Sequence, residues 1–379
     1  MGAAFVTSPV SASAATSSFT DPGCSTWDVP AGVTMVHISA TGAAGVSTSQ
    51  SSGGRGDGVS GTLTGLTSGE ALQVCVDYGG GNGTGEASTS PAGAPGGAST
   101  VAIGGEFPTP VLVAGGGGGA GSSGTGSGDS SPGGNGGDAG YPAGSPGGSA
   151  PGGAAGGGGG TDRSGGVGGV NGSGGTGAFA GSPGTGFFQT PGLGGAGGAD
   201  YYTGAPVLTF GGGGGAGYYG GGGGAGGNPG AGGGGGGGGS DYCAPSVTGC
   251  AVTAGAGTQT KAGSAPGDAE VVITMPDPTL LIASPAVVQT SPAAAPLFKL
   301  SATLTDRLTR AAVPHESVAF TAGKTTLCSV LTNAAGVATC TANSKAGSAA
   351  AVVENDGYTV HFRGDASYLP SSGSAGLAG

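Results

Sequence analysis

The sequence predicts an all-β protein made of two β-sandwiches, the first of which carries long glycine-rich segments. Three observations predict this fold. Short β-branched segments separated by Gly, Pro and Ser turns occupy both ends of the chain. Glycine accounts for 98 of the 379 residues and is concentrated between residues 78 and 264. Within that stretch the heptapeptide GGGGGAG occurs three times, at residues 115–121, 211–217 and 220–226.

Two of these heptapeptides follow similar apolar segments, PVLVA at residues 110–114 and PVLTF at residues 206–210. An apolar lead-in that recurs before the same glycine block indicates a repeated structural unit rather than a flexible linker. Ordering a glycine costs about 1–2 kcal/mol of backbone entropy, and glycine has no side chain to bury in return. The blocks can therefore be ordered only if their backbone groups pair densely or if flanking strands hold their ends.

The strands of the first sandwich are predicted on both sides of the glycine blocks. The segment at residues 267–275 is the last of them, and we expect it to close the same sheet as the first ones. A glycine-rich insertion over about residues 79–263 would then be held at both ends, inside a glycine-rich β domain at residues 17–276. The other predicted strands are residues 26–30, 33–40, 58–66, 70–79, 98–104, 110–114 and 206–210.

The composition becomes ordinary after Pro276-Asp277-Pro278. About seven short strands with turn signals between them are expected in the remaining hundred residues, which is the pattern of an immunoglobulin-like (Ig-like) β-sandwich. We assign this second domain to residues 279–379. Its predicted strands are residues 279–288, 298–306, 317–323, 325–332, 336–342, 349–355 and 357–365.

The six cysteines form an even set without a C-x-x-C metal or redox pattern. They separate by region into three expected disulfides. Pairing the last two across the turn at residues 333–336 would place Thr332 opposite Gly336 in a tight hairpin. Disulfides are typical of oxidising compartments. The expected pairs are Cys24–Cys75, Cys243–Cys250 and Cys328–Cys340.

The N-terminus also favours export. Residues 1–16 are small and apolar and contain the pattern Ala12-Ser13-Ala14, which is typical of signal-peptide cleavage sites. A basic segment does not precede it. We interpret residues 1–16 as the remnant of a signal peptide or as a disordered N-terminus, and expect the mature protein to be secreted, extracellular or attached to the cell surface.

The charge balance limits the classes of partner. The net charge is −11, and Lys and Arg together number 9. Nucleic-acid binding is disfavoured because it requires clustered basic residues. No apolar run approaches the ~20 residues of a transmembrane helix. The expected partner is an extracellular or cell-surface ligand whose identity the sequence does not give.

The C-terminal region resembles a known family in four segments, LSATLTD (300–306), VPHESVAFT (313–321), TTLCSVLTNAAGVATC (325–340) and GYTVHFRGDASYLPSS (357–372). Through them residues 279–377 resemble a bacterial Ig-like repeat of secreted and surface proteins. The resemblance covers the whole region and implies a β-sandwich that serves as a spacer.

Residues 19–275 resemble a second family in the segments at residues 27–45, 53–81, 111–121 and 267–274. They are similar to the glycine-rich domain of bacterial, often actinobacterial, secreted proteins. Similar modules occur in some phage tail adhesins and in ectodomains of receptors of the anaplastic-lymphoma-kinase type. The resemblance implies a β-sandwich from which glycine segments extend as packed polyglycine II helices, with three residues per turn and amides free to bond to neighbouring helices. It implies no catalytic residues and no cofactor.

Several short motif matches have ordinary explanations. Residues 323–325 imitate only the end of a P-loop, and residues 133–138 match one calcium-binding nonapeptide without a second copy. The tripeptide at residues 55–57 is Arg-Gly-Asp in a glycine loop, which we interpret as turn chemistry before a strand. Residues 369–373 differ from a sortase signal and are expected to follow the last Ig-like strand.

The three histidines, His37, His315 and His361, lack ligand spacing, and no metalloprotease motif or nucleophile elbow is present. We therefore expect a protein that is not an enzyme.

The leading hypothesis is a secreted or cell-surface structural or adhesive protein. Two alternatives remain: a module that binds carbohydrate or another ligand through the glycine-rich domain, and a disordered elastic spacer. Paired aromatic residues are the candidate ligand contacts, although they could instead cap the junction between sheet and glycine helices. These candidates are Phe187, Phe188, Tyr201, Tyr202, Tyr218 and Tyr219.

Overall fold

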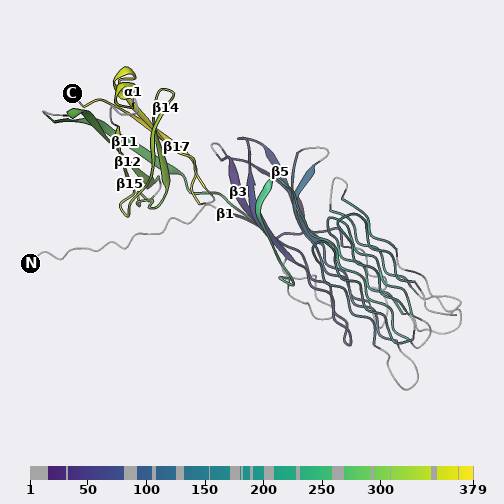
Figure 1. Cartoon of the computed structure of the whole chain (residues 1–379). Helices are drawn as coiled ribbons and strands as arrows, with labels where there is room; N and C mark the ends of the chain where they lie inside the picture. Colours follow the sequence, from purple (N-terminus) through teal and green to yellow (C-terminus); the bar gives the residue numbers. More distant parts are fainter. Residues whose placement is uncertain are drawn as a thin grey trace, which may run out of the picture. The chain divides into compact units, whose positions relative to one another are not determined.

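The chain divides into two compact units, one of residues 16–274 and one that comprises residues 275–379 (Figure 1). Both are almost entirely β, which confirms the predicted fold class. The structure is a computed structural model. It describes residues 16–30, 33–80, 92–104, 108–124, 132–152, 154–170, 180, 182–187, 191–199, 209–227, 231–257, 269–291, 294–307, 309–342, 348–365 and 367–378.

The first unit contains two five-stranded antiparallel sheets. One has the order β1-β10-β3-β4-β9, the other β2-β5-β6-β7-β8. The last strand, β10, pairs with both β1 and β3, so the C-terminal end of the unit closes the first sheet as predicted. The strands are β1 (Thr16–Phe19), β2 (Gly23–Asp28), β3 (Met35–Thr41), β4 (Gly58–Thr64), β5 (Ala71–Tyr78), β6 (Ala98–Ile103), β7 (Thr109–Ala114), β8 (Tyr242–Cys243), β9 (Val247–Thr253) and β10 (Glu270–Thr274).

The core of this sandwich follows from the alternation of apolar and polar residues along its strands. In β3, Val36, Ile38 and Ala40 are fully buried while the residues between them face outward. Strands of the two sheets contact one another, including β4 with β7 and β10 with β5. Burial of Leu72 from β5 and Ile273 from β10 completes the apolar layer between them.

The glycine segments form a bundle that extends from the sandwich (Figure 1). Its central segment is residues 233–240, in which every backbone amide donates and every carbonyl accepts a hydrogen bond. Successive residues face different neighbours, and every third residue returns to the same one. This is the periodicity of a polyglycine II helix, as predicted. The amides bond to residues 116–122, 145–148 and 219–225, with that of Gly235 donating to Gly148, and the carbonyls accept from residues 134–140, 157–160 and 212–218.

The three GGGGGAG blocks are the inner segments around this centre. A methyl group on Gly117 would lie 2.2 Å from the carbonyl oxygen of Gly54, so the spacing of the helices leaves no room for a side chain there. The alanines of the second and third blocks pack against other small side chains. Ala216 packs with Ala98 and Val113, and Ala225 packs with Ala150 and Ala154.

The glycine region is not a single insertion over residues 79–263. Residues 42–57, which precede it, belong to the bundle: the Gly117 amide donates to the carbonyl of Ala43 at 3.0 Å. Strands β6 to β9 lie inside the predicted insertion and belong to the sandwich. The chain therefore passes repeatedly between sheet and bundle, because each glycine segment needs neighbours from distant parts of the sequence to satisfy its backbone.

The second apolar lead-in differs from the first. Residues 110–114 lie in β7, whereas residues 206–208 are outside the described residues and Phe210 makes only an isolated bridge with Ala199. Phe210 already belongs to the bundle. Its amide bonds to the side-chain oxygen of Ser122 at 2.7 Å, and its carbonyl accepts from the Ser122 amide at 2.9 Å.

The second unit is a two-sheet sandwich with the strand orders β11-β12-β15 and β14-β13-β16-β17. Its core consists of buried side chains from both sheets, including Leu300, Leu304, Phe320 and Val360. The elements are β11 (Thr279–Ser291), β12 (Ala294–Asp306), β13 (Ser317–Ala322), β14 (Thr325–Leu331), β15 (Val337–Ala342), α1 (Ser348–Glu354), β16 (Gly357–Phe362) and β17 (Ser371–Gly376).

The predicted strand at residues 349–355 is wrong, because these residues form α1. Alanine is the strongest helix former, and the segment contains three in succession. Ala349 and Val352 face the core three residues apart while Val353 is 55% exposed, which is the periodicity of one helix face. The apolar composition resembled a buried strand, and packing against the sheets selected the helix.

The three disulfides are Cys24–Cys75, Cys243–Cys250 and Cys328–Cys340, the pairs expected from the sequence. The first joins directly opposite residues of neighbouring strands β2 and β5. The other two each connect edge strands of different sheets, β8 to β9 and β14 to β15.

The predicted hairpin between Cys328 and Cys340 is therefore wrong. The turn exists, and the Asn333 amide bonds to the carbonyl of Val337 at 3.0 Å. Beyond the turn, however, the Thr332 amide donates to the carbonyl of Glu316, directly before β13 of one sheet. The Gly336 carbonyl accepts from the amide of Leu304 in β12 of the other sheet. The chain changes sheets at this turn, so the disulfide closes one side of the sandwich.

Candidate functional site

An aromatic cluster, comprising Phe187, Tyr218, Tyr219 and Tyr242, lies where the bundle meets the second sheet of the first unit. Tyr218 and Tyr242 are stacked with ring centroids 4.1 Å apart, and Phe187 lies 6.2 Å from Tyr218 on the same stack. Tyr219 meets Tyr218 edge to face at 5.1 Å. All four rings are half-buried.

The cluster rests on Ala98 of β6, Val113 of β7 and Ala216 of the second heptapeptide. Burial raises the pKa of the Tyr218 hydroxyl, and Tyr242 and Tyr219 add to the rise. Stacked rings in such a place anchor the bundle to the sheet and still leave part of their surface for a ligand.

Of the sequence-predicted contacts, the structure brings Phe187, Tyr218 and Tyr219 together. Phe188, Tyr201 and Tyr202 lie outside the described residues. Tyr242 was not among the predicted contacts, because it is a single tyrosine rather than one of a pair. Its position next to Cys243, at the end of the longest glycine run, was the one available signal.

The carboxyl groups of Asp57 and Asp241 form a second unusual site at the base of the bundle. Both residues are 1% exposed. Asp57 Oδ1 accepts from the amide of Gly255 and Asp241 Oδ1 from that of Gly115, each at 2.7 Å. Burial raises the pKa of both carboxyls. The charge of Asp138 adds to the rise at Asp57 and that of Asp57 to the rise at Asp241, while the hydrogen bonds from the Gly255 and Gly115 amides oppose it. Asp57 belongs to the Arg-Gly-Asp tripeptide, so that aspartate is enclosed rather than displayed.

The calcium-like motif at residues 133–138 has a structural use. Its Asn135 and Asp138 side chains accept hydrogen bonds from the amides of Ser52 and Arg55, at 3.0 and 2.7 Å. These bonds give hydrogen-bond partners to two backbone amides of the neighbouring bundle segment, residues 42–57. Within the described ranges, no group of three or more His, Cys, Asp or Glu side chains could hold a metal ion.

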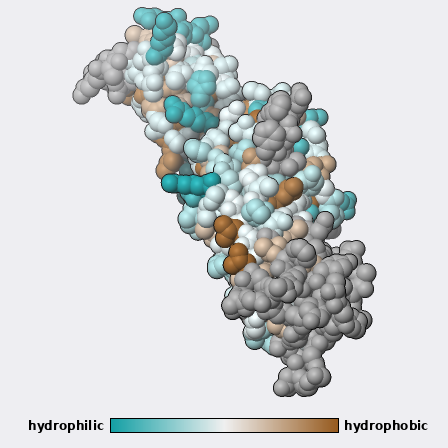
Figure 2. All heavy atoms as spheres, turned by 90° about the vertical axis from the view of Figure 1, so that its right-hand side faces the viewer, coloured by the Kyte–Doolittle hydropathy of each residue, from teal (hydrophilic) through white to brown (hydrophobic). Residues whose placement is uncertain are grey.

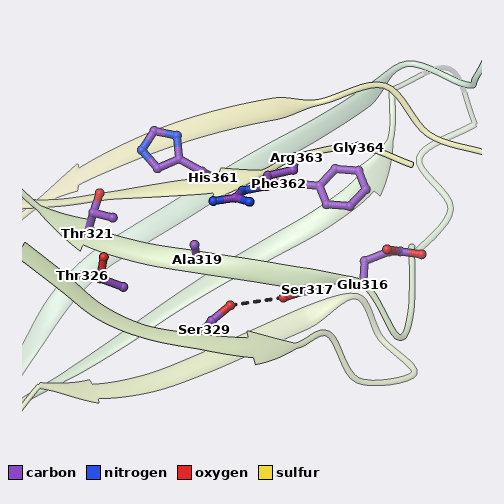
Figure 3. A pocket seen from close by; sticks show the side chains of 10 residues that line it. All are labelled: Glu316, Ser317, Ala319, Thr321, Thr326, Ser329, His361, Phe362, Arg363 and Gly364. Atoms are coloured by element: carbon purple, nitrogen blue, oxygen red, sulfur yellow. Dashed lines mark hydrogen bonds between the residues drawn. The ribbon is translucent and has the colours of Figure 1, made fainter. Parts of the chain in front are cut away.

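The second unit has a hollow on the outer face of its four-stranded sheet, with a volume of about 750 Å³ (Figure 3). Strands β13, β14 and β16 supply most of its lining. A second hollow of about 570 Å³ shares Thr321 and His361 with it. The first hollow is lined by Glu316, Ser317, Ala319, Thr321, Thr326, Ser329, His361, Phe362, Arg363 and Gly364.

The histidines are distributed as the sequence indicated. His37 is exposed on β3, with Nδ1 3.3 Å from Thr62 Oγ1. His315 lies in the loop before β13, and His361 is exposed on β16. The P-loop-like residues 323–325 include the turn between β13 and β14, where Gly323 has a φ of 53°.

Exposed apolar side chains of the described residues are scattered. On the face shown in Figure 2, brown apolar groups are small and separate among pale and hydrophilic atoms. Among the described residues of the bundle, the most exposed apolar side chains are Val167 at 72% and Val170 at 66%. Within the described residues, no helix has the length and apolar character needed to cross a bilayer.

No protein-family model and no curated protein sequence matches this chain.

Proposed function

We propose that this protein is a secreted or cell-surface structural or adhesive protein without catalytic activity, in which the glycine-rich unit is the functional module and the Ig-like unit is a spacer. The observation that carries the proposal is the hydrogen-bond saturation of residues 233–240. A segment bonded on all sides to other segments is held in one conformation, and it is buried throughout. Such a bundle suits a rigid module that presents a surface.

The same observation argues against an elastic spacer. An elastic segment needs many accessible conformations, which requires that its backbone groups exchange freely with water. We therefore expect the amides of residues 233–239 to exchange slowly with deuterium, close to the rate of β3. Exchange as fast as in an unfolded peptide would overturn the rigid-module proposal and favour the elastic spacer.

The three disulfides support an extracellular setting. All six cysteines are paired, and cytosolic proteins rarely keep such bonds. Protein collected from the culture medium of its source cells should resist alkylation of its thiols until it is reduced. Protein found only in the cytosol, with alkylatable cysteines, would contradict this part of the proposal.

Adhesion is tested directly with beads that carry the full chain. Beads coated with the protein should be retained under flow on cells or extracellular polymers better than beads coated with albumin. Equal retention would overturn the adhesive role and leave a purely structural one.

A second candidate function is ligand binding through the aromatic cluster, which the half-exposed rings favour. Phe187→Ser removes one ring from the stack, whereas Val167→Ser alters an exposed apolar residue on another bundle segment. Loss of bead retention with Phe187→Ser alone would assign the contact to the cluster. Equal retention by both variants would exclude it.

A further inference from the structure

The outer face of the four-stranded sheet in the second unit has a small residue, Ala319, at its centre. Alternation buries Val318 and Phe320 of β13 and directs Ala319 outward. Ala319 lies directly opposite Ser329 of β14 on one side and His361 of β16 on the other. A small residue between two larger ones lowers the middle of the face, which produces the hollow.

Arg363 extends over this hollow. It follows β16, is exposed, and its guanidinium lies above the sheet between His361 and Ala319 (Figure 3). It makes no ion pair with any described residue. Glu316 lines the same hollow, yet its carboxylate points away from the guanidinium (Figure 3), and its electrostatic neighbours are Asp365 and His315. In a protein of net charge −11, this free arginine is a local site for an anion.

Hydroxyl groups line the same hollow as the guanidinium. The side-chain oxygens of Ser317 and Ser329 lie 3.1 Å apart and share one hydrogen bond, which leaves each of them further bonding capacity. Thr321 and Thr326 stand on the same face (Figure 3). Hydroxyls of this kind both donate and accept, as the hydroxyls of a sugar do.

The shape favours a chain-like ligand. The second hollow continues the first beyond Thr321 and His361, and its polar lining includes Asn355, Thr359 and Ser374. It also includes one carboxylate, that of Asp356, so an acidic group of the ligand is expected at the Arg363 end. The large apolar side chains in the two linings, Phe362 and Tyr358, are each only 4% exposed, so neither hollow offers a surface for the apolar anchor of a peptide. A nucleic acid requires several clustered cations, and Arg363 is the one Arg or Lys that lines either hollow.

We propose that this sheet face binds a strand of acidic polysaccharide, with Arg363 holding a carboxylate or sulfate group and the Ser and Thr hydroxyls bonding to sugar hydroxyls. This gives the Ig-like unit a binding site of its own, beyond its proposed role as a spacer. The site is independent of the glycine bundle and does not rest on that proposal.

Isothermal titration calorimetry of the full chain tests the site with four probes: a hexuronic-acid oligosaccharide, a sulfated oligosaccharide, a neutral glucan oligosaccharide and an oligoglutamate peptide. We expect binding of one or both acidic saccharides, weakened by added salt because the charges are exposed. The two acidic probes distinguish a carboxylate from a sulfate as the recognised group.

Arg363→Gln should weaken that binding at least about tenfold, since a charge-assisted bond is lost. Ala319→Tyr should abolish it by filling the hollow. Arg307→Gln, which changes an exposed arginine of the same unit outside the hollow, is the matched control and should bind like the unchanged protein. Unchanged circular dichroism of each variant shows that it is folded.

Three results would overturn the proposal: no binding of either acidic saccharide, equal binding by Arg363→Gln, or equal binding of the neutral glucan. Tighter binding of oligoglutamate than of both acidic saccharides would assign the face to an acidic peptide instead, and would also overturn it.

Discussion

Asp57 and Asp241 are paired carboxyls at the base of the glycine bundle, and each is 1% exposed. Hydrogen bonds between Gly115 and both aspartates link distant parts of the chain. The Gly115 amide donates to Asp241, while the Gly115 carbonyl accepts from the Asp57 amide at 3.1 Å. With both carboxyls ionised, Asp241 Oδ2 has no hydrogen-bond partner among the described residues, and a proton shared with Asp57 provides one. The pair is therefore most stable with one proton.

This relationship predicts that the first unit is more stable in mild acid than in mild base. Burial raises the pKa of both carboxyls above the value of 3.8 for an unperturbed aspartate. The folded state then binds protons more tightly than the unfolded state. Stability is highest at acid pH and is lost as pH rises through the raised pKa. Unfolding in denaturant, followed at about pH 5 and about pH 8, should show a higher midpoint at the lower pH.

The single tryptophan makes this measurement specific. Trp27 lies in β2, so its fluorescence reports on the first unit. Asp57→Asn should reduce the pH dependence and raise stability at the higher pH, because an amide can donate to Asp241 without ionising. Asp28→Asn, at an exposed position of β2, is the control and should leave the pH dependence unchanged. An unaltered pH dependence in Asp57→Asn would contradict the shared proton.

A second prediction concerns the close packing of the bundle. Gly117→Ala places a methyl group 2.2 Å from the carbonyl oxygen of Gly54, a backbone atom that cannot move aside alone. We expect a loss of at least about 2 kcal/mol in the free energy of unfolding. Val167→Ala, at a bundle residue that is 72% exposed, should change it by less than about 0.5 kcal/mol.

The same reasoning applies to the second heptapeptide. A methyl group on Gly214 would lie 2.1 Å from the carbonyl oxygen of Gly221, so Gly214→Val should destabilise the bundle as Gly117→Val does. Ala120→Ser should cost less than either, because Ala120 already carries a Cβ in the bundle. Deuterium exchange of residues 233–239 measures the effect locally, and equal exchange in all three variants would refute close packing.

A third prediction concerns Tyr358 of the second unit. Its single hydroxyl proton is shared between the carbonyl oxygens of Ser284 in β11 and Ser301 in β12, both of which lie within hydrogen-bonding distance. The register of β11 shifts after Ser284, so the regular pairing of β11 with β12 is interrupted there. The carbonyl of Ser284 depends on the tyrosine for its hydrogen bond. Tyr358→Phe should lower the free energy of unfolding of this unit by about 1–3 kcal/mol. Calorimetry measures the loss, and Tyr368→Phe is the control because the Tyr368 hydroxyl makes no hydrogen bond with a described residue. Equal losses in the two variants would contradict the role of this hydroxyl.

A fourth prediction ranks two disulfides of the first unit. Cys24–Cys75 closes a loop with a sequence separation of 51, and Cys243–Cys250 one of 7. A longer loop restricts the unfolded chain more. Replacing both members of the first pair with serine should therefore cost about 2–4 kcal/mol, more than the same change in the second pair. Trp27 fluorescence during unfolding measures both, and the reverse order would show that the edge connection between sheets matters more than loop length.

The sequence by itself determined most of the local structure. Alternating β-branched segments predicted β3, β4, β5 and β10, because burial of one strand face leaves a period of two. Cysteines confined to separate regions indicated the three pairs. The repeated glycine blocks indicated a repeated structural unit, since only dense backbone pairing or flanking strands could offset the entropy of so many glycines, and the family resemblance implied that the unit is a packed polyglycine II helix.

The tertiary structure alone decided which segments are neighbours. Residues 115–121, 211–217 and 220–226 have one sequence, so nothing in their composition specifies that they surround residues 233–240. The same is true of Asp57 beside Asp241, because two separate aspartates carry no signal of their contact. The change of sheet after β14, the helix at α1 and the hollow at Ala319 also depend on packing between distant segments. The local sequence determines the kind of backbone pairing that a segment can make. Which other segment it pairs with is decided only when distant parts of the chain pack together.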